Sequence, residues 1–163
     1  MKAFISWSGQ RSRAAAEELH EWLQPVMPTT IEPWMSDTDL DKGSRWAVGL
    51  GEGLEEMSAG ISVLTPENLR SPWLNFEAGA IGKAFGEGRV MTFLIGLSPT
   101  DVPQPLAQFQ ATSRTREDVT KMITDLNKLT ETPMKDYILA KQIEAWWLQL
   151  DRQLGQIEKN APA

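Results

Sequence analysis

The sequence predicts a doubly wound α/β fold, a mainly parallel five-stranded sheet with helices on both faces. Short apolar segments typical of strands alternate about five times with segments whose apolar residues recur at helical spacing. One strand segment, residues 89–97, is almost continuously apolar, as expected of a parallel strand covered on both faces. Together these patterns indicate the flavodoxin-like arrangement, and one more helix is expected at the C-terminal end.

Five segments are predicted to be strands because they are short, apolar and bounded by turn-forming residues. They are residues 3–7, 30–36, 60–65, 89–97 and 106–112. Pro33 places the second strand at a sheet edge or at a bulge, because proline cannot donate a hydrogen bond to a neighbouring strand. The last segment is short enough to be an edge strand as well.

The predicted helices have apolar residues three or four positions apart. The first follows Gly9 and is expected to end at Pro25 and Pro28. Three more are predicted over 46–57, 71–85 and 115–129, and the last begins after Pro133. The last helix carries one long apolar stripe, formed by Leu139, Ile143, Trp146, Trp147, Leu150, Leu154 and Ile157. We assign residues 1–130 to one domain and residues 131–163 to a helical extension packed on it.

Composition excludes several classes of function. At 163 residues, 41% of them hydrophobic, the chain suits one domain with an ordinary core. The formal net charge of -6, without a long run of Lys or Arg, argues against nucleic-acid binding. Disulfides and thiolate chemistry are excluded because there is no cysteine. No segment resembles a signal peptide or a membrane span, so a cytoplasmic protein without membrane contact is expected.

The most informative residues lie where the predicted strands end. In open α/β sheets, ligands bind outside the carboxyl ends of the strands, which here are residues 7–9, 36–43 and 65–73. Trp73 and Glu77 follow directly and are four residues apart, so a helix places both on one face, an acid beside an aromatic wall. We therefore predict that Glu77 is a catalytic residue, although a solvated acid on a helix is the simpler interpretation of the residue alone.

Other familiar sites do not fit this edge. A phosphoacceptor domain of the same fold class would need an Asp where Thr65 ends the third strand. The acidic loop with Asp37, Asp39 and Asp41 lacks the bidentate Glu that a calcium loop has at its twelfth position. The only histidine, His20, has no neighbours that would complete a metal or triad site. We therefore expect no metal site.

Four ordered blocks resemble a known family. They are Phe4-Ile5-Ser6-Trp7-Ser8-Gly9; Trp34-Met35-Ser36 with Asp39-Leu40-x-x-Gly43-x-x-Trp46; Gly60-Ile61-Ser62-Val63-Leu64-Thr65; and Ser71-Pro72-Trp73-x-x-x-Glu77-Ala78-Gly79-Ala80. In this order they resemble a bacterial TIR (Toll/interleukin-1 receptor) domain, and Phe109-Gln110-Ala111-Thr112 resembles its end. The resemblance covers roughly residues 1–129.

The resemblance implies an activity and assigns residues to it. Enzymatic TIR domains cleave NAD+ at the nicotinamide–ribose bond, so NAD+ would be a substrate and no cofactor is expected. The Glu of their Trp-x-x-x-Glu motif is catalytic, which corresponds to Glu77 here, with Trp73 in the aromatic position. Trp7, Ser8, Gly9, Ser36 and Trp46 are the further expected substrate-binding residues. Some members have Arg where this chain has Ser8 and Gly9, and many have an acid near Ser36, so pyrophosphate contacts and nucleotide choice stay open.

The loop at residues 37–44 resembles the BB loop of the family, which packs on a neighbouring TIR domain and gates the pocket. Its assigned residues are Asp37, Asp39, Leu40 and Gly43. The resemblance therefore implies self-assembly with other TIR domains. A compact TIR protein of this kind is similar to those of anti-phage defence systems, in which the product activates a separate effector.

Three functions follow from these interpretations. The leading one is an NAD+ nucleohydrolase or ADP-ribosyl cyclase that produces ADP-ribose or a cyclic or modified form of it. The alternative is a non-enzymatic TIR adaptor that acts through contacts between TIR domains. A nucleoside deoxyribosyltransferase-like enzyme, with related glycosidic chemistry, is the weaker enzymatic alternative.

Overall fold

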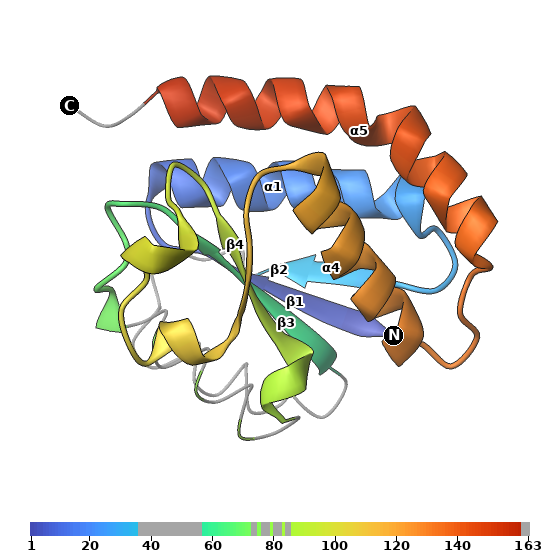
Figure 1. The fold of residues 1–163 in the computed structure, drawn as a ribbon, viewed down its shortest axis with the longest axis horizontal. Coiled ribbons are helices and arrows are strands. Elements are labelled where there is room, and N and C mark those ends of the chain that lie inside the picture. Colours follow the sequence, from blue (N-terminus) through green and yellow to red (C-terminus); the bar gives the residue numbers. More distant parts are fainter. Residues whose placement is uncertain (36–56, 73–74, 76–78, 80–82, 84–85, 161–163) are drawn as a thin grey trace.

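The computed structural model describes residues 1–35, 57–72, 75, 79, 83 and 86–160. Its sheet has five parallel strands in the order β2-β1-β3-β4-β5 (Figure 1). The strands are β1 Lys2–Ser6, β2 Glu32–Met35, β3 Met57–Leu64, β4 Val90–Leu94 and β5 Gln110–Thr112. The predicted flavodoxin-like fold class is confirmed, and β2 lies at a sheet edge as Pro33 indicated.

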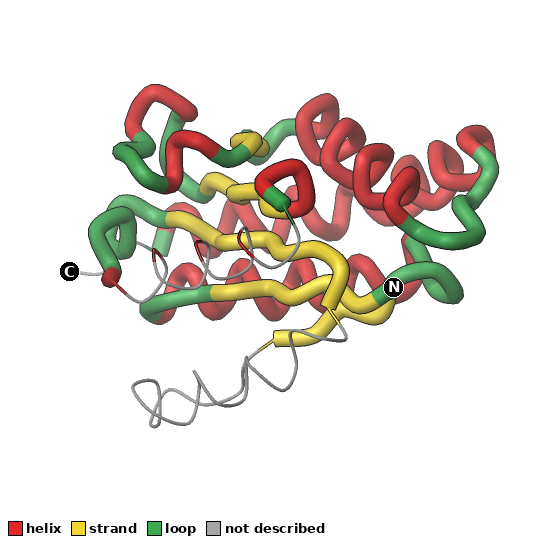
Figure 2. The backbone as a smooth tube through the Cα atoms, turned by 90° about the horizontal axis from the view of Figure 1, so that it is seen from below, coloured by secondary structure: helices red, strands yellow, loops and turns green. Residues whose placement is uncertain are grey.

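The alternation of side chains along β1 divides the core into two parts. Ala3 and Ile5 belong to a large cluster that contains residues of three helices, whereas Phe4 belongs to a smaller cluster on the other face. The three helices are α1 Gln10–Val26, α4 Arg116–Leu129 and α5 Asp136–Lys159. Figure 2 shows the strands side by side with helices behind them. The smaller cluster consists of Phe4, Leu64, Val90, Leu94, Val102, Leu106 and Phe109.

The predicted C-terminal helix is α5, which runs antiparallel to α1 along its outer side (Figure 1). Five residues of the predicted stripe are buried: Leu139, Ile143, Trp147, Leu150 and Leu154. Trp146 was wrongly placed in this stripe, since 37% of it is exposed. The backbone carbonyl of Trp146 accepts a hydrogen bond from Trp22 Nε1 of α1 at 3.0 Å. Among the described helices, none combines the length and hydropathy needed to cross a membrane.

Several predicted strand boundaries were wrong, each for a local reason. β3 begins at Met57, which was assigned to a helix, because Met57 pairs with Lys2 of the neighbouring strand. β4 ends at Leu94, since Gly96 turns the chain with a φ of +71°. The last strand was expected to begin at residue 106. Instead residues 106–108 form a 3₁₀ turn that buries Leu106, and only Gln110–Thr112 pair with β4.

Helix boundaries agree better with prediction. α4 begins after Thr115, whose side chain accepts a hydrogen bond from the Asp118 amide, and buries Val119, Met122, Ile123 and Leu126 as expected. Pro25 does not end α1 but lies in its last turn. In the predicted helix over 71–85, the described residues Pro72, Asn75, Gly79 and Lys83 are helical. The helix predicted over 46–57 lies outside the described residues, apart from Met57.

We expect α5 to unfold together with the sheet, and two leucines of this helix test that. Leu154 is fully buried, so Leu154→Ala should lower the free energy of unfolding by about 3 kcal/mol through lost burial and the cavity left behind. Leu148 is 68% exposed, so Leu148→Ala should change it by less than about 0.5 kcal/mol. Denaturant unfolding followed by circular dichroism measures both. A separate early transition in Leu154→Ala would show that α5 is an independent unit.

Candidate functional site

The carboxyl edge of the sheet brings together two of the three predicted binding segments. The chain leaves β1 at Ser6 and continues through Trp7, Ser8 and Gly9 into α1, while the chain leaving β3 turns at residues 66–70. The hydroxyls of Ser8 and Ser71 lie 3.5 Å apart across this edge. Two loops distant in sequence therefore lie side by side where the fold class predicts a ligand site.

Asn68 joins the ends of the two strands. Its Oδ1 accepts a hydrogen bond from the Thr65 amide at 2.8 Å, and its Nδ2 donates to the carbonyls of Ser8 at 2.9 Å and Val63 at 3.1 Å. The residue is only 4% exposed. Ser12 adds a second link, because its hydroxyl donates to the Val63 carbonyl at 2.8 Å and accepts from the Ser8 amide at 3.1 Å. These bonds fix the backbone on both sides of the edge.

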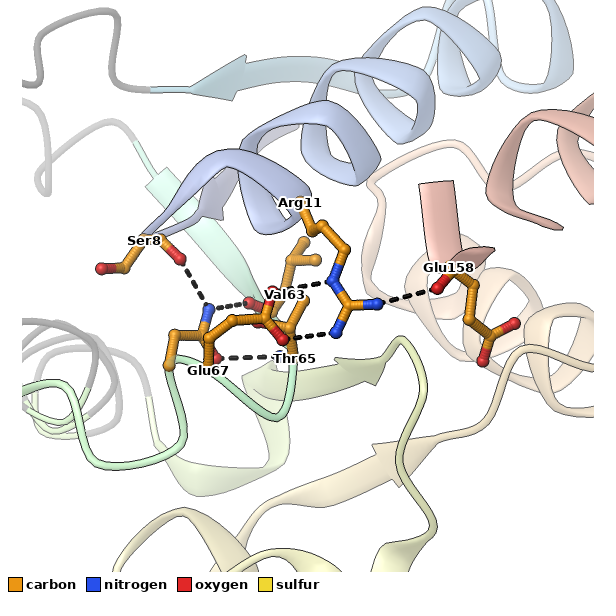
Figure 3. A network of polar contacts seen from close by, with 7 residues as sticks. Ser8, Arg11, Val63, Thr65, Glu67 and Glu158 are labelled. Atoms are coloured by element: carbon orange, nitrogen blue, oxygen red, sulfur yellow. Dashed lines mark hydrogen bonds and ion pairs between the residues drawn. The ribbon is translucent and has the colours of Figure 1, made fainter. Parts of the chain in front are cut away.

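Arg11 is the central charged residue of the edge (Figure 3). Its guanidinium makes a bidentate ion pair with Glu67, with Nε 2.7 Å from Oε2 and Nη2 bonded to Oε1. Its Nη1 donates to the backbone carbonyl of Glu158 at 2.8 Å. The side chain is 9% exposed, and such an Arg–carboxylate fork is among the stronger polar interactions in proteins. Arg11 thus holds the β3 turn and the end of α5 at once.

Arg11 lies at a position in α1 where a cation is unfavourable unless an anion such as Glu67 pairs with it. Arg11 lies in the first turn of α1, where the helix dipole disfavours a cation and favours an anion. The hydrogen bond from Arg11 lowers the pKa of the Glu67 carboxyl, and the same bond raises the pKa of Arg11. Both groups are therefore charged at neutral pH.

Trp7 packs in the hydrophobic core, and Gly9 adopts a backbone conformation that favours glycine. Trp7 is buried in the large core cluster, and the guanidinium carbon of Arg13 lies 5.3 Å from the centre of its ring. Gly9 precedes α1 with a φ of +89°, which other residues rarely adopt, while a Cβ there would meet nothing within 4 Å. The conformation, rather than the space, requires glycine at this position.

Eight predicted site residues lie outside the described residues. They are Ser36, Asp37, Asp39, Leu40, Gly43, Trp46, Trp73 and Glu77. Their roles in binding, assembly and catalysis stay predictions. The described part of the edge offers the hydroxyls of Ser8 and Ser71. Within the described ranges, no group of three His, Cys, Asp or Glu residues could hold a metal ion.

Comparison with protein families matches residues 3–129 to the TIR domain. The chain belongs to the TIR-domain family. The match covers all five strands except Lys2, the first residue of β1, and it ends with α4. In this TIR protein α5 therefore lies beyond the matched part, and its contact with Arg11 crosses the boundary. No curated protein was found to match the chain.

Sequence reasoning missed Arg11, Ser12, Glu67 and Asn68. A signal for Asn68 was present, because it lies four residues after the end of β3, and an Asn in a turn can bond nearby backbone groups with its side chain. Arg11 and Glu67 are 56 residues apart, and nothing local to either position predicts that they pair. The contact depends on the sheet order, which places β1 and β3 side by side.

Removing the Asn68 side chain should destabilise the TIR domain. Asn68→Ala leaves the Thr65 amide and the Ser8 carbonyl without these partners, at a cost of about 2 kcal/mol in free energy of unfolding. Asn127→Ala is a matched comparison, since Asn127 is also buried and bonds both backbone groups of Met134. Denaturant unfolding should show losses of similar size. An unchanged midpoint for Asn68→Ala would contradict this account of the edge.

The ion pair should make stability depend on pH in a defined direction. Folding lowers the pKa of Glu67 from its ordinary value of 4.5. The contribution of the ionised carboxylate to the free energy of unfolding is therefore fully present above pH 4.5, and it is lost as the pH falls through the lowered pKa of the folded state. Glu67→Gln should therefore be less stable than wild type at pH 7 by about 1 kcal/mol, a modest figure because the carboxylate is partly solvated. The difference should shrink below pH 4.5. Urea unfolding at several pH values measures it, and a gap that widens in acid would contradict the assignment.

Proposed function

We propose that this TIR protein cleaves NAD+ at the nicotinamide–ribose bond, with Glu77 as the catalytic carboxylate. Membership of the TIR family, together with the Trp73-x-x-x-Glu77 motif, carries the proposal. The products are nicotinamide and either ADP-ribose or a cyclic or otherwise modified ADP-ribose. NAD+ is the substrate in this scheme, and no cofactor takes part.

The chemistry requires little more than one well-placed carboxylate. Nicotinamide leaves as a neutral base from a cationic N-riboside, so the leaving group needs no strong general acid. Positive charge develops on the ribose as the bond breaks, and an ionised Glu77 would stabilise that charge or capture it briefly. Trp73 would provide an apolar wall that excludes water from the reacting face.

The described structure supports this proposal through the position of the residues that directly precede the motif. Ser71 and Pro72 stand directly before Trp73, and the Asn75 amide donates to the Ser71 carbonyl at 3.2 Å, which is the first helical bond of the segment. Ser71 lies against Ser8 at the carboxyl edge. The residues that lead into the motif therefore lie at the edge at which ligands bind in this fold class.

The deciding experiment is incubation of purified protein with NAD+ over a range of protein concentrations, with products identified by mass spectrometry. Glu77→Gln should lower nicotinamide release by about 10³-fold, because the stabilising charge is lost while the shape of the site is kept. Glu131→Gln, at an exposed position between α4 and α5, is the matched control and should keep wild-type activity. Concentration matters because TIR domains are expected to assemble.

Each outcome has a clear meaning. The second product distinguishes a hydrolase from a cyclase, and base exchange with free nucleobases would indicate the deoxyribosyltransferase-like chemistry. If concentrated wild type leaves NAD+ intact while self-association is observed, the protein is an adaptor that acts through contacts between TIR domains. We further propose that the activity serves anti-phage defence, with a separate effector that responds to the product.

A further inference from the structure

We propose that α5 is a positioning element for the active-site edge, and that Arg11 is the positioning residue through which it acts. The last turn of α5 holds Arg11, Arg11 holds the turn at residues 65–70, and that turn fixes Ser71, where the motif segment begins. This inference rests on the proposed function in assigning a catalytic consequence. Its structural part stands on the contacts alone.

The first link satisfies a group that a helix end normally leaves unpaired. The last four carbonyls of an α-helix have no partner within the helix, and Glu158 is the penultimate residue of α5. Arg11 Nη1 donates to this carbonyl at 2.8 Å. Because Arg11 is 9% exposed, solvent competes little for the bond. The end of α5 and the start of α1 are thus joined across 147 residues of sequence.

The second link anchors the same turn of α5 to the sheet. Arg114, between β5 and α4, contacts the Glu158 carboxylate at 2.7 Å and Asp151 at 2.8 Å. A Cβ at Gly96, just after β4, would lie 3.7 Å from the Glu158 side chain and also 3.7 Å from Pro66. Glu158 therefore lies where the ends of β3, β4 and β5 meet, beside the turn that Arg11 holds.

The third link leads from Glu67 to the edge that carries Ser71. Arg11 fixes Glu67 by two bonds, and the next residue, Asn68, ties the turn to Ser8. The Ser71 amide donates to the Asn68 carbonyl at 2.9 Å, so the chain is hydrogen-bonded up to the start of the motif segment. A shift of α5 would be transmitted along this path, since each step is a short, directed bond.

Hydrogen exchange tests the coupling without any assay of activity. Arg114→Gln removes the ion pairs with Asp151 and Glu158 and leaves the bonds of Arg11 to Glu67 and to the Glu158 carbonyl in place. If α5 positions the edge, this variant should speed exchange of the Asn68 and Ser71 amides by about tenfold. Glu67→Gln should in turn speed exchange in the last turn of α5. Glu17→Gln, which removes an exposed ion pair with Arg13 on α1, is the matched control and should do neither.

A double-mutant cycle tests the catalytic consequence. Arg114→Gln and Glu67→Gln should each lower kcat by about tenfold with little change in KM, because they loosen the edge that presents the motif rather than a substrate contact. The double variant should lower kcat by less than the product of the two single effects. Arg114 and Glu67 do not contact each other, so such a shortfall would show that they act on the same hydrogen-bonded path from α5 to Ser71. Arg11→Lys should recover part of kcat relative to Arg11→Gln, because a lysine pairs with Glu67 but cannot hold the Glu158 carbonyl with the same fork.

Opposite outcomes overturn the proposal. If Arg114→Gln speeds amide exchange only in α5, and Glu67→Gln speeds it only in residues 65–71, then the end of α5 and the turn after β3 are independent of each other. Multiplicative effects on kcat would show the same. If wild type does not cleave NAD+ at all, the proposed function fails, while the exchange data still decide whether α5 holds the edge.

Discussion

Asn68 provides hydrogen bonds that the ends of β1 and β3 would otherwise lack. The last residue pair between these two strands joins Ser6 and Ser62, so beyond it β1 and β3 are no longer hydrogen-bonded to each other as strands, although Val63 and Leu64 still pair with β4. One buried amide serves Ser8, Val63 and Thr65 together. The Asn68 side chain therefore sets the spacing of the two loops at the carboxyl edge, and Ser12 adds a second link between them.

The charged contacts of the edge depend on that spacing. A buried Arg in the first turn of a helix is unfavourable by itself, both because burial removes its hydration and because the helix dipole repels it. Glu67 offsets this cost only because the turn held by Asn68 brings its carboxylate within hydrogen-bond distance of both Nε and Nη2 of Arg11. Removing either partner would leave the other charge poorly solvated, so the pair acts as one unit.

Periodicity predicted the elements of this fold but not the contacts between them. The fold class followed from alternating apolar segments, and the inward residues of α4 followed from helical spacing, since both patterns are visible in local sequence. Trp146 and Trp147 are adjacent, and spacing alone did not decide which of them is buried. At the site, Trp73 and Glu77 were predicted from a motif and lie outside the described residues. Arg11 and Glu67 escaped prediction because charged residues in a helix start and a turn are ordinarily solvated.

The contacts at the carboxyl edge join residues inside the part that matches the TIR family to residues of α5 beyond it. Arg11, Glu67 and Arg114 lie within the part that matches the TIR family, whereas Asp151 and Glu158 lie beyond it. A buried guanidinium inside the family domain thus donates to a carbonyl that only the extension supplies. Without α5, Nη1 of Arg11 would lose its acceptor and Arg114 would lose two carboxylates. The geometry of this edge therefore depends on residues that the family motif does not include, and the chemistry of the motif alone does not determine it.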